Sequence, residues 1–469
     1  MIEGLKPYAE SATTKPITRT SDINIPWLTA IPEHWKVVRS KGLFTARTER
    51  ARPDDEQLSA TQAYGVIPQK EFESRVGRKV VRITQNLEKR AHVEPDDFVI
   101  SMRSFQGGLE RAWSRGCIRS SYVVLKPSPE AQVGYFAHLF KSLDYIRALQ
   151  ATSNFIRDGQ DLNFNNFSLV DLPLPPLDEQ ATIAKCLDHA NRKIDGFIRA
   201  KRKLIGLLNE QKQAIIHRAV TRGLDPDTPL KPSGVPWLGD IPRHWEIVRN
   251  MALFAHRVES GISGLPVLQV SLRSGISAEE LDQFGRPKKL IADARKYKRI
   301  HQGDVAYNTM RMWQGAVGVS PCDGLVSPAY VVLKARQDTC PVFYDFVFHT
   351  EVYKQQVNRQ STGIVSDRNR LYWDSFKEMP NLTLPRAEQE DIVAFIVDRT
   401  THLNTAIART EREIALMQEY RTRLTADIVT GKLDVREAAA TLPELPAEPF
   451  TDETPGDSDM LNEIESEES

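Results

Sequence analysis

Apolar residues recur at alternating spacings of four and three along two stretches of the chain, residues 180–221 and 389–430. The first stretch has Ile183, Leu187, Ala190, Ile194, Phe197, Leu204, Leu208 and Ile215 at these positions, and the second has Ile392, Ile396, Leu403, Ile407, Ile414, Met417, Leu424 and Ile428. A mean period of about 3.5 residues is the seam of a coiled coil. Each stretch is therefore predicted to be a helix, about 60 Å long at roughly 1.5 Å per residue.

The two stretches are copies of one pattern. Each follows a proline, opens with a Glu-Gln pair and closes with a glycine-containing turn before Leu-Asp. Gln180 and Gln389 open the copies and Thr221 and Thr430 close them, so counterparts lie 209 residues apart at both ends. Two equal helices with matching apolar stripes bury both stripes when they pair. We expect an antiparallel coiled coil with one globular unit at each end.

Two polar residues, Lys201 and Gln211, fall on the seam of the first copy. A polar residue at such a position can fix the register of the helices, can face a third partner helix, or can lie at a solvated edge of the seam. The sequence leaves these alternatives open.

The segment in front of each helix is repeated as well. Residues 25–44 and 235–254 share eleven of twenty positions without a gap, and both contain an Ile-Pro-x-His-Trp motif. Farther on, alternating and β-branched runs predict strands, and apolar spacing at 132–150 and 340–358 predicts helices. We interpret the repeated tryptophans as core residues and the repeated histidines as hydrogen-bonding scaffold; these residues are Trp35, Trp245, His34 and His244.

The predicted fold class is α+β, with two globular domains, two long antiparallel coiled-coil helices and a pseudo-two-fold internal repeat. The predicted parts are a leader at 1–24, a first globular domain at 25–176, a first helix at 177–224, a linker at 225–234, a second globular domain at 235–385, a second helix at 386–435 and an acidic disordered tail at 436–469.

Composition supports a soluble protein, because 41% of the residues are hydrophobic and 26% are charged. No apolar run reaches the roughly 18 residues of a membrane span, and the first residues lack the apolar core of a signal peptide. The four cysteines form no metal-like cluster, so we expect reduced thiols in a cytoplasmic protein and no metal.

The net charge of zero is unevenly distributed. Residues 437–469 contain 11 acidic residues and no Lys or Arg, which leaves 62 basic and 51 acidic residues in 1–436. The Pro-rich acidic end is predicted to be disordered. A basic body is compatible with a nucleic-acid partner.

Cations that could contact DNA cluster where the two globular domains diverge, in 45–95 and 255–300. In the first domain these are Arg75, Arg78, Lys79, Arg82, Lys89 and Arg90, and in the second they are Arg286, Lys288, Lys289, Arg295, Lys296, Lys298 and Arg299. Arg and Lys serve both guanine and phosphate contacts. Any one of them is more often a solvated surface cation, so the prediction rests on the clusters.

One candidate contact position is shared by both domains. Arg103 with Gln106 in the first domain corresponds to Arg311 with Gln314 in the second, and a glycine follows each glutamine. A glycine there lets the backbone approach a phosphate or a base edge. Because the position is shared, we assign it to phosphate contact or scaffold and not to discrimination between bases.

Catalytic motifs are absent from the sequence. It has no G-x-x-x-x-G-K-[ST] phosphate loop and no Asn/Asp-Pro-Pro-aromatic box of an amino-methyltransferase. The nuclease-like Glu210-Gln211-Lys212 lies inside the first predicted long helix, where a structural role is favoured. We therefore expect no catalytic residues and no cofactor in this chain.

The order of the repeats resembles the specificity subunit of a type I restriction-modification system. The resemblance is carried by IPEHW and IPRHW, by LPLPPLDEQ and LPRAEQ, and by the equal helices that end in TRGLD and TGKLD, and it covers about residues 25–435. It implies two target-recognition domains that each read half of a bipartite, asymmetric sequence in double-stranded DNA, in a chain without catalytic activity. It also implies docking of two modification subunits, which bind S-adenosylmethionine and methylate adenine. Motor-nuclease subunits that use ATP and Mg would complete the complex.

Two competing hypotheses remain open at this point. A structural adaptor would use the coiled coil to join two protein-binding modules without nucleic acid, which the basic clusters disfavour. A fused nuclease or methyltransferase acting alone would need the motifs that the sequence lacks.

Overall fold

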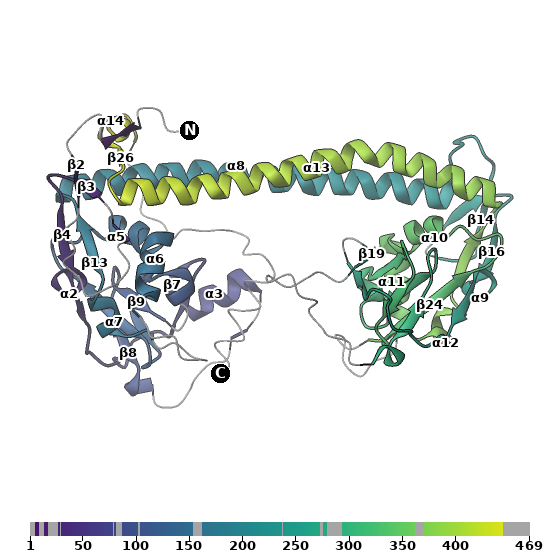
Figure 1. Ribbon diagram of the computed structural model, residues 1–469, viewed down its shortest axis with the longest axis horizontal. Helices are drawn as coiled ribbons and strands as arrows, with labels where there is room; N and C mark the ends of the chain where they lie inside the picture. The colour runs from purple at the N-terminus through teal and green to yellow at the C-terminus, as the bar shows by residue number, and fades with distance from the viewer. Residues whose placement is uncertain are drawn as a thin grey trace. The chain divides into compact units, whose positions relative to one another are not determined.

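The computed structural model describes residues 5–8, 14–16, 27–28, 30–77, 79–80, 87–101, 104–152, 162–236, 238–272, 275–278, 293–361 and 369–443. The chain forms two compact units: unit one comprises Met1–Lys201 with Arg412–Ser469, and unit two comprises Arg202–Glu411. Each unit contains one globular module and one half of each long helix (Figure 1).

The two long helices are α8 (Leu177–Arg222) and α13 (Arg386–Val429). In unit one Asp195 pairs with Arg421, and Lys201 Nζ lies 2.7 Å from Glu413 Oε2. The residue numbers of the paired side chains decrease along α13 as they increase along α8. The helices therefore run antiparallel there, as predicted. In unit two Lys212 Nζ donates to Asn404 Oδ1 at 2.8 Å, which continues the same register.

The two polar seam residues have different environments. Lys201 makes the interhelical ion pair with Glu413, whereas Gln211 is exposed. Register control therefore describes Lys201, whereas the exposure of Gln211 is compatible with both a solvated edge and a third partner helix.

The apolar seam differs from the predicted one in its detail. Phe197 and Leu204, expected on the seam, are 37% and 40% exposed, while Ile198 and Ile216 are buried. A helix with 3.6 residues per turn drifts against a 3.5-residue repeat, so the buried stripe moves by one position. The buried ends of the helices pack into the core of a module, as Ile183 and Leu187 do in unit one.

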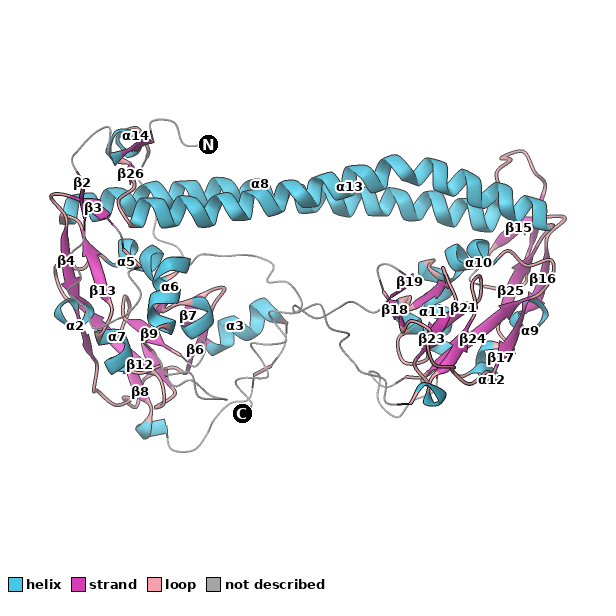
Figure 2. Ribbon diagram, viewed as in Figure 1, coloured by secondary structure: helices cyan, strands magenta, loops and turns pink. Residues whose placement is uncertain are grey.

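The module of unit one contains a four-stranded antiparallel sheet in the order β10-β9-β12-β5 and several two-stranded ladders (Figure 2). Its strands are β2 (Thr14–Pro16), β3 (Ala30–Pro32), β4 (Lys36–Arg39), β5 (Phe44–Ala46), β6 (Leu58–Thr61), β7 (Gly65–Pro68), β8 (Ala91–Val93), β9 (Phe98–Ile100), β10 (Glu110–Arg111), β11 (Gly116–Ile118), β12 (Val123–Pro127) and β13 (Asp171–Leu174). Its helices are α2 (Ser40–Leu43), α3 (Gln69–Val76), η1 (Leu87–Lys89), α4 (Ser104–Gly107), α5 (Val133–Phe140), α6 (Leu143–Gln150) and α7 (Phe164–Ser168).

The module of unit two repeats this plan with the sheet β17-β24-β21-β22. Its strands are β14 (Leu230–Pro232), β15 (Asp240–Pro242), β16 (Glu246–Arg249), β17 (Phe254–Arg257), β18 (Leu268–Ser271), β19 (Gly275–Ala278), β20 (Lys298–Ile300), β21 (Val305–Asn308), β22 (Val317–Val319), β23 (Gly324–Val326), β24 (Tyr330–Ala335) and β25 (Pro380–Thr383). Its helices are α9 (Asn250–Leu253), η2 (Ala294–Lys296), η3 (Met312–Gln314), α10 (Pro341–Phe348), α11 (Glu351–Gln360) and α12 (Trp373–Phe376). The α+β class and the internal repeat are confirmed.

Aromatic rings fill equivalent places in the two cores. Phe44 contacts Phe136 and Phe140 with ring centroids 5.1 and 5.3 Å apart. In the other module Phe254 contacts Tyr344 and Phe348 at 5.5 and 5.9 Å. Such tilted and edge-on pairs add to the burial of apolar area.

The glutamine of each Glu-Gln pair fastens its long helix to its own module. The Gln180 amide donates to the carbonyls of Glu130 and Pro175 at 3.1 and 2.8 Å, and its oxygen accepts from the Gln132 backbone N–H at 2.9 Å. Gln389 makes the equivalent three bonds, to Asp338, Leu384 and Cys340, at 2.9, 2.9 and 2.8 Å.

The glutamate of each pair binds the repeated histidine, as the scaffold interpretation predicted. His34 Nε2 lies 2.7 Å from Glu179, and His244 Nε2 lies 2.8 Å from Glu388. Trp35 and Trp245 are both fully buried, as predicted.

Each tryptophan also lies against the end of the other long helix. A Cβ on Gly431, after α13, would come within 3.1 Å of the Trp35 ring, and one on Gly223, after α8, would come within 3.5 Å of the Trp245 ring. Each module therefore holds the start of one long helix and the end of the other.

Parts of the predicted leader and tail are folded in unit one, which differs from the boundaries drawn on the sequence. β1 (Lys6–Pro7) pairs with β26 (Leu433–Asp434), and α14 (Arg436–Ala440) packs Ala438 and Ala439 into the core. Tyr8 is buried there and donates to Glu179. Short apolar side chains within a charged segment give burial that composition alone does not reveal. Residues 444–469 lie outside the described residues.

Candidate nucleic-acid interface

Eleven of the seventeen predicted contact residues fall where the structure describes side chains or backbone. The other six, Arg78, Arg82, Arg103, Arg286, Lys288 and Lys289, lie outside the described residues.

In the first module Arg75 belongs to α3, which ends at Gly77 in a left-handed conformation (φ 71°). The Arg75 guanidinium pairs with Glu71 at 2.6 Å and lies over the ring of Tyr64, 4.9 Å from its centroid. Lys79 follows this helix and is exposed. Arg75 is therefore held on an aromatic platform at the surface, which restricts the directions in which it can reach.

Lys89 and Arg90 lie at the end of η1, beside β8. Lys89 is exposed, and its carbonyl accepts a bond of 2.9 Å from Arg50. Burial raises the pKa of the Cys117 thiol, and a hydrogen bond from Arg90 opposes that shift. Arg90 therefore also serves the scaffold.

In the second module the predicted cations divide into exposed and engaged groups. Arg295 and Lys296, in η2, are exposed, and Arg295 Nε lies 3.1 Å from Asp293. Lys298 donates to the Tyr330 carbonyl at 2.6 Å, and burial lowers its pKa. Arg299 pairs with Asp323 at 3.4 Å. Lys298 and Arg299 are bonded within the module and half-buried, which limits how far they can extend to a ligand.

The shared contact position is a helical turn in both modules. Gln106 is exposed on α4, and Arg311 and Gln314 are exposed around η3, which ends at Gly315 with φ 95°. The glycine permits this left-handed turn. In the first module the left-handed residue comes one position later, at Gly108 (φ 77°), and each turn presents an exposed glutamine.

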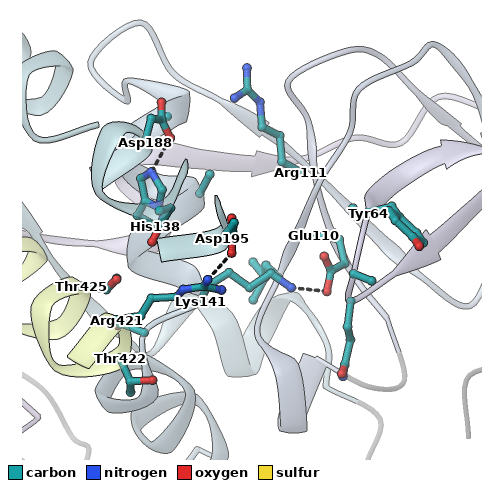
Figure 3. A pocket seen from close by; sticks show the side chains of 18 of the residues that line it. Tyr64, Glu110, Arg111, His138, Lys141, Asp188, Asp195, Arg421, Thr422 and Thr425 are labelled. Atoms are coloured by element: carbon teal, nitrogen blue, oxygen red, sulfur yellow. Dashed lines mark hydrogen bonds and ion pairs between the residues drawn. The ribbon is translucent and has the colours of Figure 1, made fainter. Parts of the chain in front are cut away.

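Unit one contains a cavity near the predicted contact residues of the first module, and the sequence analysis did not predict it (Figure 3). Its volume is about 540 Å³, and its walls come from the β6–β7 turn, β10, the α5–α6 region, α8 and α13. Its lining residues include Gln62, Tyr64, Glu110, Arg111, Trp113, His138, Lys141, Asp188, Asn191, Arg192, Asp195, Arg199 and Arg421.

Three ion or hydrogen-bonded pairs organise the charged walls of the cavity. Lys141 Nζ lies 2.5 Å from Glu110 and His138 Nε2 lies 2.8 Å from Asp188, while Arg421 bonds Asp195 between the two long helices (Figure 3). Arg111 pairs with Asp96 at 2.6 Å and stacks over Trp113 at 4.1 Å. Counted over the lining, Lys and Arg outnumber Asp and Glu by five to three.

The cavity continues the predicted contact surface of the first module. Tyr64, which carries Arg75, lines it. Gln62 also lines it and lies against Gly107, next to Gln106: a Cβ on Gly107 would approach the Gln62 amide nitrogen to 2.4 Å. Arg75 contacts one lining residue, Tyr64, and Gln106 is the sequence neighbour of Gly107, which lies against another, Gln62.

A sequence signal for the cavity exists in the comparison of the two helix copies. Arg192 and Arg199 are seven residues apart and therefore share a face of α8. Their counterparts 209 residues later are Thr401 and Ala408. A charged face present in one copy alone could have been found by this alignment.

In comparisons with known proteins, a family model matches one part of the chain and a single relative matches most of it. The family described as "Type I restriction modification DNA specificity domain" matches residues 32–204. The EcoKI specificity subunit of Escherichia coli (strain K12) is 23% identical over 412 residues, which cover 79% of this chain and 84% of that relative. Over most of its length this chain is similar to type I restriction-modification specificity subunits, and residues 32–204 match the model of their specificity domain.

Other similar proteins match a smaller part of the chain or share the fold. The MjaVIII specificity subunit of Methanocaldococcus jannaschii is 26% identical over 222 residues, and the match spans about half of each chain (47% of this one and 49% of the relative). A solved chain from work on the assembly and conformational transition of a type I R-M system has a TM-score of 0.56 and 16% identity, and covers 86% of this chain and 99% of that one. That likeness concerns the fold.

The family is one of non-catalytic subunits that carry no cofactor of their own. Within the described parts of this chain, no three His, Cys, Asp or Glu side chains gather as a metal site would require. The helices in those parts include none with the length and hydropathy to cross a membrane.

Proposed function

We propose that this chain is the subunit that selects the DNA target of a type I restriction-modification complex. Each module reads one half of a bipartite, asymmetric target in double-stranded DNA. One observation carries this proposal: two modules built on the same frame present different side chains where they diverge. In the first module Arg75 of α3 lies over Tyr64, and η1 has Glu88 where the equivalent η2 of the second module has Arg295.

The long helices set the number of unread base pairs between the half-sites. Sites read on one face of a duplex lie about one helical turn apart, roughly 34 Å. The antiparallel register held by Lys201–Glu413, Asp195–Arg421 and Lys212–Asn404 supports this role.

The same helices dock two modification subunits, which bind S-adenosylmethionine and methylate adenine. Exposed apolar side chains support this assignment, because single-chain burial leaves them uncovered. They are Phe197, Leu204 and Leu207 on α8 and Val397 and Leu416 on α13. Motor-nuclease subunits that use ATP and Mg complete the complex, which acts in the cytoplasm.

The competing adaptor function is separated from this one by a DNA-binding experiment. The chain, together with its modification subunit, is titrated with duplex DNA at a series of salt concentrations. Phosphate contacts release counterions, so the logarithm of the binding constant should fall linearly with the logarithm of salt concentration. A complex that binds no duplex at any salt concentration would favour the adaptor.

Candidate residues are tested in the same titration. Arg75→Ala should weaken binding and, as a phosphate contact, lower the salt slope by about one. The matched control is Arg249→Ala, an exposed arginine paired with Glu378 at 2.7 Å on β16, which should leave the slope unchanged. An equal change in both variants would remove Arg75 from the interface.

A further inference from the structure

The acidic end of the chain opposes the charge of everything that precedes it. Residues 444–469 hold ten Asp and Glu and no Lys or Arg, so residues 1–443 keep all 62 basic and the other 52 acidic residues. The family resemblance covers residues up to about 435 and does not account for this segment. Its charge is the same in sign as that of a DNA backbone.

The described structure ends at Pro443, which is bonded to α8 in unit one. α14 anchors the preceding residues in the core, and His189 Nε2 then donates to the Pro443 carbonyl at 2.7 Å. His189 is on α8, between the cavity residues Asp188 and Asn191. Pro443, the last described residue, is therefore held against α8, the helix that provides part of the cavity wall.

The cavity lies in unit one, which also contains Pro443, and charged residues of α8 form part of its wall. Asp188, Arg192 and Arg199 of α8 line it. Their counterparts on α13 are Val397, Thr401 and Ala408. The scaffold of the two halves is otherwise repeated, so the extra cations on α8 are not required by helix pairing.

The same cavity borders the predicted DNA contacts of the first module, through Tyr64 under Arg75 and through Gln62 beside Gly107. A polyanion bound at its mouth would meet Arg192, Arg199 and Lys141. It would occupy the approach that the phosphates of a duplex would use.

We propose that residues 444–469 bind across this cavity in the absence of DNA and compete with duplex phosphates for the first module. The inference rests on the proposed DNA-reading function. A stretch of 26 residues spans up to about 85 Å at roughly 3.3 Å per residue, ample for a cavity next to its anchor. Tethering gives the segment an effective concentration in the millimolar range, enough for weak charge-based contacts to compete.

Competition of this kind changes selectivity. Non-specific binding depends on phosphate contacts alone, whereas target binding adds base contacts. The acidic segment therefore suppresses non-specific binding more than target binding and raises the ratio between them.

The first test removes the charge of the segment. The full complex of the chain with its modification subunit is compared with two variants, one truncated after Pro443 and one with all ten Asp and Glu of 444–469 changed to Asn and Gln. At low salt, about 50 mM, both variants should bind a duplex without target roughly tenfold more tightly, and the gain should shrink towards 200 mM. The control changes only the Ser and Thr of 444–469 to Ala and should bind as the parent does.

The second test locates the site. Arg192→Ala/Arg199→Ala is prepared with and without the segment, beside Lys203→Ala/Arg218→Ala, which removes two exposed cations of the same helix away from the cavity. Truncation after Pro443 should strengthen non-specific DNA binding only slightly in the Arg192→Ala/Arg199→Ala variant. It should strengthen it by the full amount in the Lys203→Ala/Arg218→Ala variant. An equal gain in both pairs would place the segment elsewhere, and no gain in the parent would overturn the proposal. If no variant bound duplex DNA at all, the proposed function itself would fail.

Discussion

Glu179 and Glu388 are counterparts in the repeat but differ in their surroundings. Glu388 accepts from Trp245 Nε1 at 3.0 Å and faces His244. Glu179 is 5% exposed and binds Tyr8, a residue without a counterpart in the second half. Burial raises the pKa of Glu179 to about 7, against opposing influence from Arg436.

This buried carboxyl predicts a pH dependence of stability. A folded-state pKa above the unfolded value means that the folded state binds more protons between about pH 4.5 and 7, so stability is lost as pH rises through that window. The raised pKa corresponds to about 3 kcal/mol. In Glu179→Gln, unfolding followed by denaturant titration from pH 5 to 8 should show a flatter profile. Glu388→Gln is the control, and identical profiles for Glu179→Gln and the parent would contradict the account.

Gln180 predicts a loss of stability that does not depend on charge. Gln180→Leu removes three bonds from a residue that is 1% exposed and leaves two backbone carbonyls and an N–H without that partner. Each buried polar group left unsatisfied costs about 1–3 kcal/mol. We expect a loss of about 3 kcal/mol or more in the free energy of unfolding. Gln211→Leu, an exposed site on the same helix, should stay within about 0.5 kcal/mol of the parent.

The roles of individual residues were predictable where the sequence repeats. His34, Trp35 and their counterparts occur in a motif that is copied with its neighbours, and both copies have the predicted scaffold contacts. Tyr8 was not predictable, because it occurs once and meets Glu179 across 171 residues of sequence.

At the scale of elements, the long helices were predictable and their contact stripe was less so. The repeat predicted the positions of α8 and α13. Ile198 and Ile216 are buried in place of the adjacent residues expected on the seam, because a straight helix drifts from a 3.5-residue period. The short strands are defined by pairing between distant segments, as in β1 with β26, and single-sequence patterns carry little of that information.

The helix pair predicts how the spacing of the target can be changed. Seven residues inserted after Leu208 in α8 and seven after Ile407 in α13 add about 10 Å to both helices while keeping the seam. The unread spacer should lengthen by about three base pairs, at 3.4 Å each. Mapping methylated sites in cells that carry the complex measures this. Insertion in α8 alone is the control, which should break the register of Lys212 with Asn404 and abolish methylation; an unchanged spacer in the double insertion would contradict the role of the helices.

At the scale of the whole molecule, the internal repeat predicted the arrangement that the two halves share. It did not predict the features that differ between them. Fold class, helix pairing and the resemblance to specificity subunits followed from the copies. The cavity of unit one did not, because its walls come from segments between Gln62 and Thr425 that only folding brings together. All seventeen contact residues remain predictions from sequence, and six of them lie outside the described residues.

The central claim is that two unlike modules on one repeated frame each read half of the target. Replacing residues 45–170 with the corresponding segment of another specificity subunit, and then mapping methylated adenines in the host genome, tests it most directly. The account predicts a new sequence in one half-site, with the other half-site and the spacer unchanged. A change in both half-sites, or in neither despite intact methylation, would contradict it.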